Sequence, residues 1–173
     1  MRVAGFTFIR NAVKFEYPIE AAVRSILPVC EKVVVAVGES EDGTLELVQS
    51  IPRTRDQKVI ILKTRWDDSL REGGRVLAEE TDKAFDAIGP GFDWCFYIQG
   101  DEVFHENGIA PLLAAMTRWK DDPTVEGLLF SYRHFYGSYD FVGDSRKWYR
   151  REVRVVRPDP AIRSWQDAMG FRK

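Results

Sequence analysis

Two adjacent carboxylates, Asp101 and Glu102, follow an apolar segment near the middle of the chain. They are separated from that segment, Trp94 to Ile98, by Gln99 and Gly100. Carboxylate oxygens are suitable ligands for Mg²⁺ or Mn²⁺, and such a cation can bridge to a diphosphate. The glycine allows a ligand to approach the backbone closely. The sequence therefore predicts a cation site here, with a solvated turn as the alternative.

Basic side chains could bind the anionic part of such a ligand. Arg10 and Asn11 follow the first apolar segment, and Arg75 lies near the start of a long helical segment. The guanidinium fork of arginine suits a pyrophosphate or a uracil carbonyl. An arginine can equally form a surface ion pair, so its place in the fold decides between the two roles. We expect Arg10, Asn11 and Arg75 at the edge of the sheet where ligands bind.

Two further carboxylates could act singly. Glu39 follows the apolar run Lys32 to Val37, where it could accept hydrogen bonds from a base or a ribose. Its neighbours Ser40 and Asp42 are instead expected to cap a helix. Asp167 lies close to an aromatic and a small residue, which could desolvate it and raise its pKa toward that of a general base. We expect Glu39 to bind a ligand and Asp167 to act as a base.

The spacing of apolar residues predicts the elements that must position these side chains. Runs rich in β-branched and aromatic residues predict five strands: Val3 to Ile9, Lys32 to Val37, Lys58 to Lys63, Trp94 to Ile98 and Gly127 to Phe135. Helical spacing predicts three helices between the first four: Tyr17 to Leu27, Thr44 to Ile51, stopped by Pro52, and Leu70 to Ile88. This alternation indicates an α/β fold whose mostly parallel central sheet has helices on both faces. Ligands of such sheets bind beyond the carboxyl ends of the strands.

The second half of the chain follows a different pattern. A helix containing Leu112, Leu113 and Met116 precedes the last predicted strand, and charged and apolar residues alternate from Arg146 to Arg157. We expect this part of the sheet to be mixed or antiparallel.

Composition excludes several classes of protein. The chain has 173 residues, 45% of them hydrophobic, which is enough for one packed core. Its net charge of −2 provides no broad basic field, so we expect no nucleic-acid partner and only local binding of any polyanion. No G-x-G-x-x-G or P-loop motif is present. Cys30 and Cys95 fit buried thiols of a reducing compartment, and the N-terminal apolar run is too short to span a bilayer. We expect a cytoplasmic protein without a transmembrane segment.

Taken together, these segments resemble the inverting family 2 glycosyltransferases of the GT-A fold, which use nucleotide-diphosphate sugars. The likeness is carried by four segments: Ile9-Arg10-Asn11, Ser40-Glu41-Asp42-Gly43-Thr44 (the S-x-D-G-T pattern), Gly74-Arg75, and Trp94 to Glu102, which leads into the D-A-D-E position. Two departures stand out. Val37 and Gly38 occupy the positions of the paired acids, which leaves Glu39 for base recognition, and Gln99 replaces the first acid of D-x-D, which leaves Asp101.

The resemblance implies a single GT-A-like domain over residues 1–173, with a nucleotide-binding half (1–102) and an acceptor-side half (103–173) that ends sooner than in the family. It implies transfer of a sugar from a nucleotide-diphosphate sugar, with a UDP-sugar favoured, to a hydroxyl of a glycan, lipid or protein acceptor by metal-assisted inverting displacement. Asp167 would be the base, and Asp101 and Glu102 would hold Mn²⁺ or Mg²⁺. The implied donor-binding residues are Arg10, Asn11, Glu39, Arg75, Gly100 and Asp101. The alternatives are a degenerate or truncated nucleotide-sugar-binding domain without turnover, and a nucleotidyltransferase.

Overall fold

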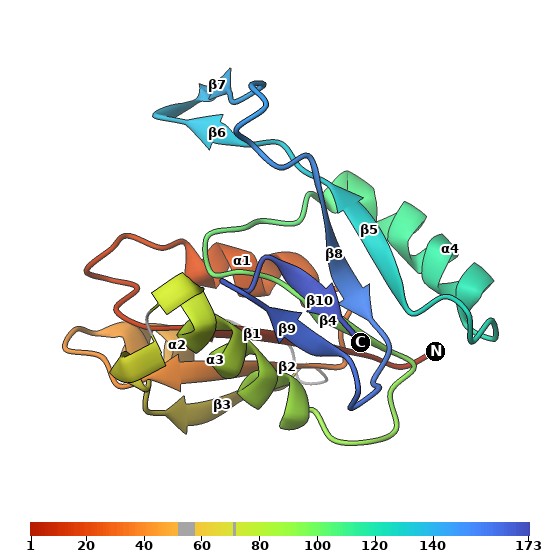
Figure 1. Cartoon of the computed structure of the whole chain (residues 1–173), viewed down its shortest axis with the longest axis horizontal. Coiled ribbons are helices and arrows are strands. Elements are labelled where there is room, and N and C mark those ends of the chain that lie inside the picture. The colour runs from red at the N-terminus through yellow and green to blue at the C-terminus, as the bar shows by residue number, and fades with distance from the viewer. Residues whose placement is uncertain (52–57, 71) are drawn as a thin grey trace.

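A six-stranded sheet forms the centre of the computed structural model, which describes residues 1–51, 58–70 and 72–173. The strand order is β3-β2-β1-β4-β8-β5 (Figure 1). The strands are β1 (Val3–Ile9), β2 (Lys32–Gly38), β3 (Lys58–Thr64), β4 (Trp94–Tyr97), β5 (Gly127–Ser131) and β8 (Arg151–Val156). The first four are parallel, whereas β8 runs antiparallel to both β4 and β5. The predicted α/β class and the mixed second half are therefore confirmed.

Helices pack against both faces of this sheet, as predicted. They are α1 (Ile19–Ile26), α2 (Thr44–Ser50), α3 (Arg75–Asp86) and α4 (Ile109–Trp119). Alternate residues of β2 point to opposite faces. Val33 and Val35 join the core that contains side chains of α1, α2 and α4, and Val34 joins the core that contains side chains of α3. Both cores are apolar, so burial of the two faces holds the strand ends in place.

The third predicted helix begins later than expected. Short 3-10 turns cover Asp68–Leu70 and Glu72–Gly74, and α3 begins only at Arg75. The reason is that Gly73 and Gly74 adopt φ of 64° and 70°, a left-handed conformation that a right-handed helix cannot continue through. Pro52, expected to end the second helix, lies outside the described residues.

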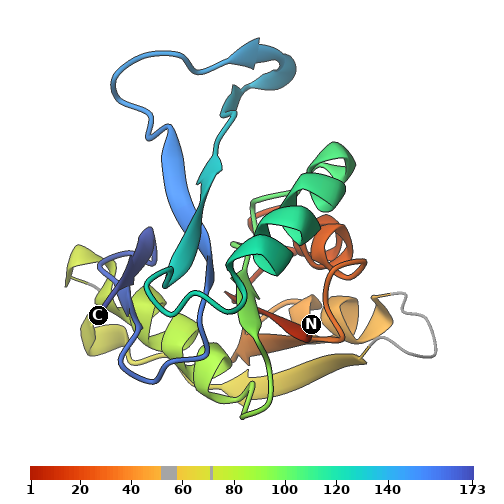
Figure 2. The same ribbon diagram turned by 90° about the vertical axis from the view of Figure 1, so that its right-hand side faces the viewer.

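The predicted strand from Gly127 to Phe135 is also divided. It ends at Ser131, and Phe135–Tyr136 (β6) pairs instead with Ser138–Val142 (β7) in a separate hairpin. We name residues 132–150 the arm, because Figures 1 and 2 show this segment projecting from the body between β5 and β8.

A second hairpin lies beside α3 on the body itself. Its strands are β9 (Arg163–Trp165) and β10 (Gly170–Arg172), and its turn carries Asp167. Figure 1 shows the hairpin in front of the sheet on the side of α3. Among the described residues, no helix has both the length and the apolar character needed to cross a bilayer.

Candidate functional site

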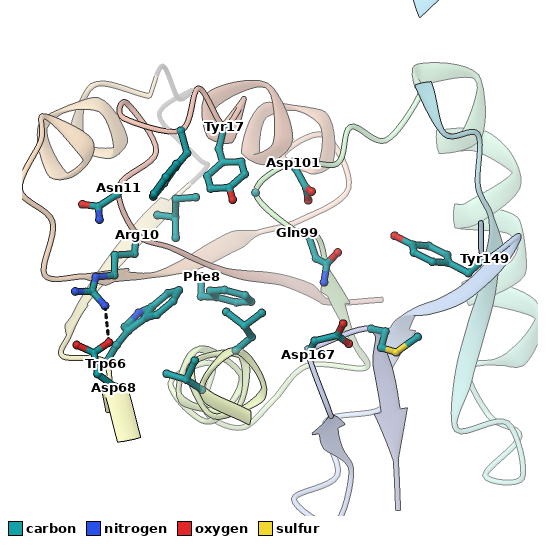
Figure 3. Close-up of a pocket in the computed structure, with 16 residues that line it drawn as sticks. Phe8, Arg10, Asn11, Tyr17, Trp66, Asp68, Gln99, Asp101, Tyr149 and Asp167 are labelled. Carbon is teal, nitrogen blue, oxygen red and sulfur yellow. Dashed lines mark hydrogen bonds and ion pairs between the residues drawn. The ribbon is translucent and has the colours of Figure 1, made fainter. Parts of the chain in front are cut away.

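A pocket of about 630 Å³ opens beyond the carboxyl ends of β1 and β4 (Figure 3). This volume lies within the usual range for small-molecule sites. The pocket brings together five of the residues selected from the sequence: Arg10, Asn11, Gly100, Asp101 and Asp167. Its position is the one expected for a ligand site in a parallel sheet.

Asp101 and Asp167 line the same part of the pocket, with Gln99 between them in Figure 3. The Gln99 side chain donates a hydrogen bond to the Ala168 carbonyl at 3.0 Å, which ties the end of β4 to the turn that carries Asp167. Partial burial and the neighbouring charge of Glu102 raise the pKa of Asp101 above its usual value. A bound cation would relieve this unfavourable charge.

Glu102 is held by protein groups on both of its oxygens. Oε1 accepts hydrogen bonds from Arg154 at 2.7 Å and from the Tyr132 hydroxyl at 2.8 Å. Oε2 accepts from Arg154 Nε and from the Gln99 backbone N–H, each at 3.0 Å. The side chains of Arg154 and Glu102 are 3% and 13% exposed. Glu102 is thus engaged in a buried ion pair, and it does not line the pocket.

This arrangement leaves Asp101 as the acidic residue of the D-x-D position that faces the pocket. In the described ranges, no group of three or more His, Cys, Asp or Glu side chains is placed to hold a metal ion. Mg²⁺ sites commonly use one or two carboxylates together with phosphate oxygens of the substrate. Asp101 alone could supply one protein ligand of a site of that kind.

Asp167 occupies a turn in which the backbone is strained. Its neighbours Gln166 and Ala168 have φ of 52° and 64°, values that non-glycine residues adopt rarely. Such residues cost free energy and are concentrated at functional sites. The backbone of Asp167 packs directly on Gly74: a Cβ added to Gly74 would lie 2.5 Å from Asp167 Cβ and 2.7 Å from Asp167 Cα.

We expect Gly74→Ala to destabilise the protein more than Gly73→Ala. Both glycines have positive φ, but a Cβ at Gly73 has no atom within 4 Å. Gly73→Ala should therefore show only the backbone cost, about 1–2 kcal/mol. Gly74→Ala adds the overlap with Asp167, for a total of about 2–5 kcal/mol. Chemical denaturation of the two variants would measure the difference, and equal losses would contradict the packing of Gly74 on Asp167.

The opposite end of the pocket is aromatic and cationic. The Arg10 guanidinium lies 5.4 Å from the ring centre of Trp66, which is 5.8 Å from the ring of Phe8. Arg10 also donates to the Glu39 carbonyl oxygen at 3.1 Å and pairs with Asp68 at 3.3 Å. Trp66 and Asp68 are not among the residues selected from the sequence, although both follow β3 and so lie at the edge where ligands were expected.

Trp66 explains one departure from the family pattern. Its indole nitrogen packs so closely on Gly38 that any Cβ there would overlap it. That nitrogen is buried and, among the described residues, has no hydrogen-bond partner. A side chain at position 38 would therefore require the Trp66 ring to move from the place that it occupies here.

The S-x-D-G-T segment positions the loop after β1. Ser40 Oγ accepts a hydrogen bond from the Asn11 backbone N–H at 3.0 Å, and Thr44 Oγ1 accepts one from that of Ala12 at 2.7 Å. The segment therefore fixes the backbone that carries Arg10 into the pocket.

Three of the selected residues do not line the main pocket: Glu102, described above, Glu39 and Arg75. Glu39 lines a smaller hollow of about 250 Å³, and its exposed carboxylate lies 3.7 Å from the Arg65 guanidinium. Arg75 is exposed in the first turn of α3. Of the two arginines selected from the sequence, Arg10 lines the main pocket and Arg75 does not. Glu39 does not line it either.

Comparison with known proteins gives a likeness of fold. No protein-family model matches the sequence, and no curated protein matches it significantly. Among solved structures, S. aureus TarS 1-349 in complex with UDP-GlcNAc matches with a TM-score of 0.50 and 20% identity, over 68% of this chain and 32% of that one. The TarS 1-349 structure in complex with UDP matches with a TM-score of 0.48 and 18% identity, over 68% and 32% of the two chains. The chain spans about a third of the length of these TarS chains. Its α/β architecture, with a mostly parallel six-stranded sheet, is the fold that it shares with the TarS 1-349 structure in complex with UDP-GlcNAc.

Proposed function

We propose that the protein binds a nucleotide-diphosphate sugar and transfers the sugar to an acceptor hydroxyl. The observation that carries this proposal is the pocket itself, in which an aromatic and cationic end and an acidic end lie in one cavity beyond β1 and β4. A nucleoside needs the first kind of surface, and a diphosphate with its cation needs the second. The TarS structures that share the fold hold UDP and UDP-GlcNAc, which supports a donor of this class.

The donor would lie with its base against Phe8 and Trp66. Aromatic rings provide stacking surfaces for any base, while the guanidinium of Arg10 can donate to a carbonyl such as those of uracil. Glu39 lines the smaller hollow and not the main pocket. It would contact the ribose or base only if the donor extended into that hollow. A UDP-sugar is the donor that we favour.

Asp101 would hold the divalent cation, Mn²⁺ or Mg²⁺, together with the diphosphate. When bound, the cation would supply charge stabilisation for the departing nucleoside diphosphate. Gly100 allows the loop that carries Asp101 to pack closely on β1, since a Cβ at this position would lie 2.8 Å from Ile9 Cδ1. We assign no cation contact to Glu102, whose oxygens are taken by Arg154, Tyr132 and Gln99.

Asp167 would take the proton from the acceptor hydroxyl. It faces the pocket beside Asp101, and Gln99 fixes its turn through Ala168. As the acceptor oxygen bonds to the anomeric carbon, the bond from that carbon to the diphosphate breaks, and configuration is inverted in a single displacement. The acceptor proton passes to the Asp167 carboxylate.

A calorimetric titration with UDP, GDP and CDP, each with and without Mn²⁺, tests the proposal. We expect one nucleotide to bind selectively and more tightly with Mn²⁺. Binding of none of the three would contradict it.

Asp101→Asn should remove the gain in affinity that Mn²⁺ provides and should also stabilise the protein at neutral pH. The second effect follows because the raised pKa of Asp101 disfavours its charged form in the folded state. The contribution of Asp101 to stability is thus present at low pH and is lost as pH rises through its raised pKa, whereas asparagine carries no such charge. Calorimetric titration of the nucleotide with and without Mn²⁺ measures the first effect. Thermal unfolding at acidic and neutral pH measures the second. Unchanged Mn²⁺-dependent binding would remove Asp101 from the site.

One observation favours a second candidate, a nucleotide-sugar-binding domain without turnover. Gln99 stands where the family has an acid, and its amide is committed to the Ala168 carbonyl. This alternative would be supported if one nucleotide binds selectively but the donor is not cleaved in the presence of glycan, lipid or protein acceptors.

A further inference from the structure

The hairpin at the end of the arm exposes an unusual concentration of large apolar side chains. Phe135, Tyr136, Tyr139, Phe141 and Val142 are between 45% and 86% exposed. All lie in β6 or β7, which Figures 1 and 2 show extended away from the sheet and its helices. Contiguous exposed apolar patches of this kind mark interaction surfaces.

The base of the arm is cationic. It contains four exposed basic residues, Arg133, Arg146, Lys147 and Arg150, and two acidic ones, Asp140 and Asp144, the second of which pairs with Arg150 at 3.4 Å. Residues 132–150 therefore carry a net charge of +2, in a chain whose overall charge is −2. A net positive charge thus lies beside the most exposed aromatic side chains of the described residues.

A stacked cluster connects this arm to the body. The ring of His134 lies 5.0 Å from that of Trp148 and 4.5 Å from that of Tyr149, and Tyr149 lies 5.1 Å from Tyr132. The Tyr132 hydroxyl in turn donates a hydrogen bond to Glu102 Oε1. The base of the arm is therefore held by packing, while the hairpin beyond it is presented to the surroundings.

We propose that the arm docks the protein on an anionic lipid bilayer. Tyrosine and phenylalanine side chains are favoured at the interface of a bilayer, where the rings contact acyl chains and the polar groups remain hydrated. Arginine and lysine beside them are attracted to anionic headgroups. A soluble polyanion would match the charges but would leave the apolar side chains of β6 and β7 exposed to water. The bilayer satisfies both features, and this inference does not depend on the proposed sugar transfer.

Co-sedimentation with vesicles tests this inference. Vesicles of phosphatidylcholine alone are compared with vesicles that also contain phosphatidylglycerol, and short-chain polyphosphate serves as the soluble polyanion. We expect binding to the anionic vesicles, little binding to the neutral ones, and weaker binding at high salt. Tight binding to polyphosphate without binding to vesicles, equal binding to both vesicles, or binding to neither would overturn the proposal.

Two arm variants separate the apolar and the electrostatic contributions. Tyr136→Ser, Tyr139→Ser and Phe141→Ser combined, and separately Arg146→Gln with Lys147→Gln, should each weaken vesicle binding by about tenfold. Arg24→Gln with Lys58→Gln removes the same charge from exposed positions on α1 and β3 and should leave binding nearly unchanged. An equal loss in this control pair, or no loss in either arm variant, would contradict docking through the arm.

A fluorescent label reports whether the hairpin itself enters the interface. The two cysteines, Cys30 and Cys95, are buried, so Ser138→Cys provides the accessible thiol for an NBD probe in β7. We expect a blue shift and increased emission on anionic vesicles. An unchanged spectrum under conditions where the protein co-sediments would show that another surface contacts the bilayer.

Discussion

Arg154→Met is expected to lower the free energy of unfolding by about 3–5 kcal/mol, the usual cost of removing one partner of a buried ion pair. The variant leaves the carboxylate of Glu102 buried with only Tyr132 and the Gln99 backbone as donors. The guanidinium it removes is almost fully buried and contacts both Glu102 oxygens. Urea denaturation of the variant and the unmodified protein would measure the loss.

Arg163 provides a matched control for this experiment. It pairs with Asp86 at 2.7 Å, the same distance as the Arg154–Glu102 pair, but the two side chains are 38% and 59% exposed. Exposed pairs contribute little, so Arg163→Met should cost less than about 1 kcal/mol. Adding Glu102→Gln to Arg154→Met should recover part of the loss, because it removes the unpaired charge. A small effect of Arg154→Met, or no recovery in the double variant, would contradict this account of the pair.

Asp167→Asn is expected to reduce the rate of donor cleavage by a factor of about 10² to 10⁴, the range that a general base contributes. Asparagine is nearly isosteric but cannot accept the acceptor proton, so donor binding should stay within about twofold of the unmodified protein. The rate is measured as release of the nucleoside diphosphate from the donor whose nucleotide binds best, with kcat and KM determined separately.

Asp121→Asn is the control for this second experiment, since Asp121 is exposed just beyond the end of α4 and does not line the pocket. It should leave both kcat and KM unchanged. If Asp167→Asn raises KM and leaves kcat unchanged, the carboxylate contributes to binding and not to proton transfer. Full activity of Asp167→Asn would exclude it as the base.

The parallel strands of the sheet could be predicted because each is a short continuous run of apolar residues in the sequence. The first strand was predicted with the bounds that the structure has, and β2 and β3 each extend one residue beyond the prediction. Buried parallel strands are continuous apolar runs, which a sequence shows directly. The same reasoning placed Arg10 and Asp101 at one edge, since both follow parallel strands.

The partners of Glu102 could not be predicted in this way. Arg154 is 52 residues away in sequence, and it reaches Glu102 only because β8 pairs antiparallel with β4. A carboxylate next to Asp101 looks like a second metal ligand until that pairing is known. The late start of α3 could not be predicted for a different reason: glycine permits a helix as well as a left-handed turn, so the residue types alone do not show that Gly73 and Gly74 adopt positive φ.

The contact between Trp66 and Gly38 constrains the order in which this site can change. A side chain at position 38 overlaps the indole ring in the place that the ring occupies here. We therefore expect an acidic residue at position 38 to be tolerated better when a smaller side chain replaces Trp66. On this expectation the two positions form an epistatic pair.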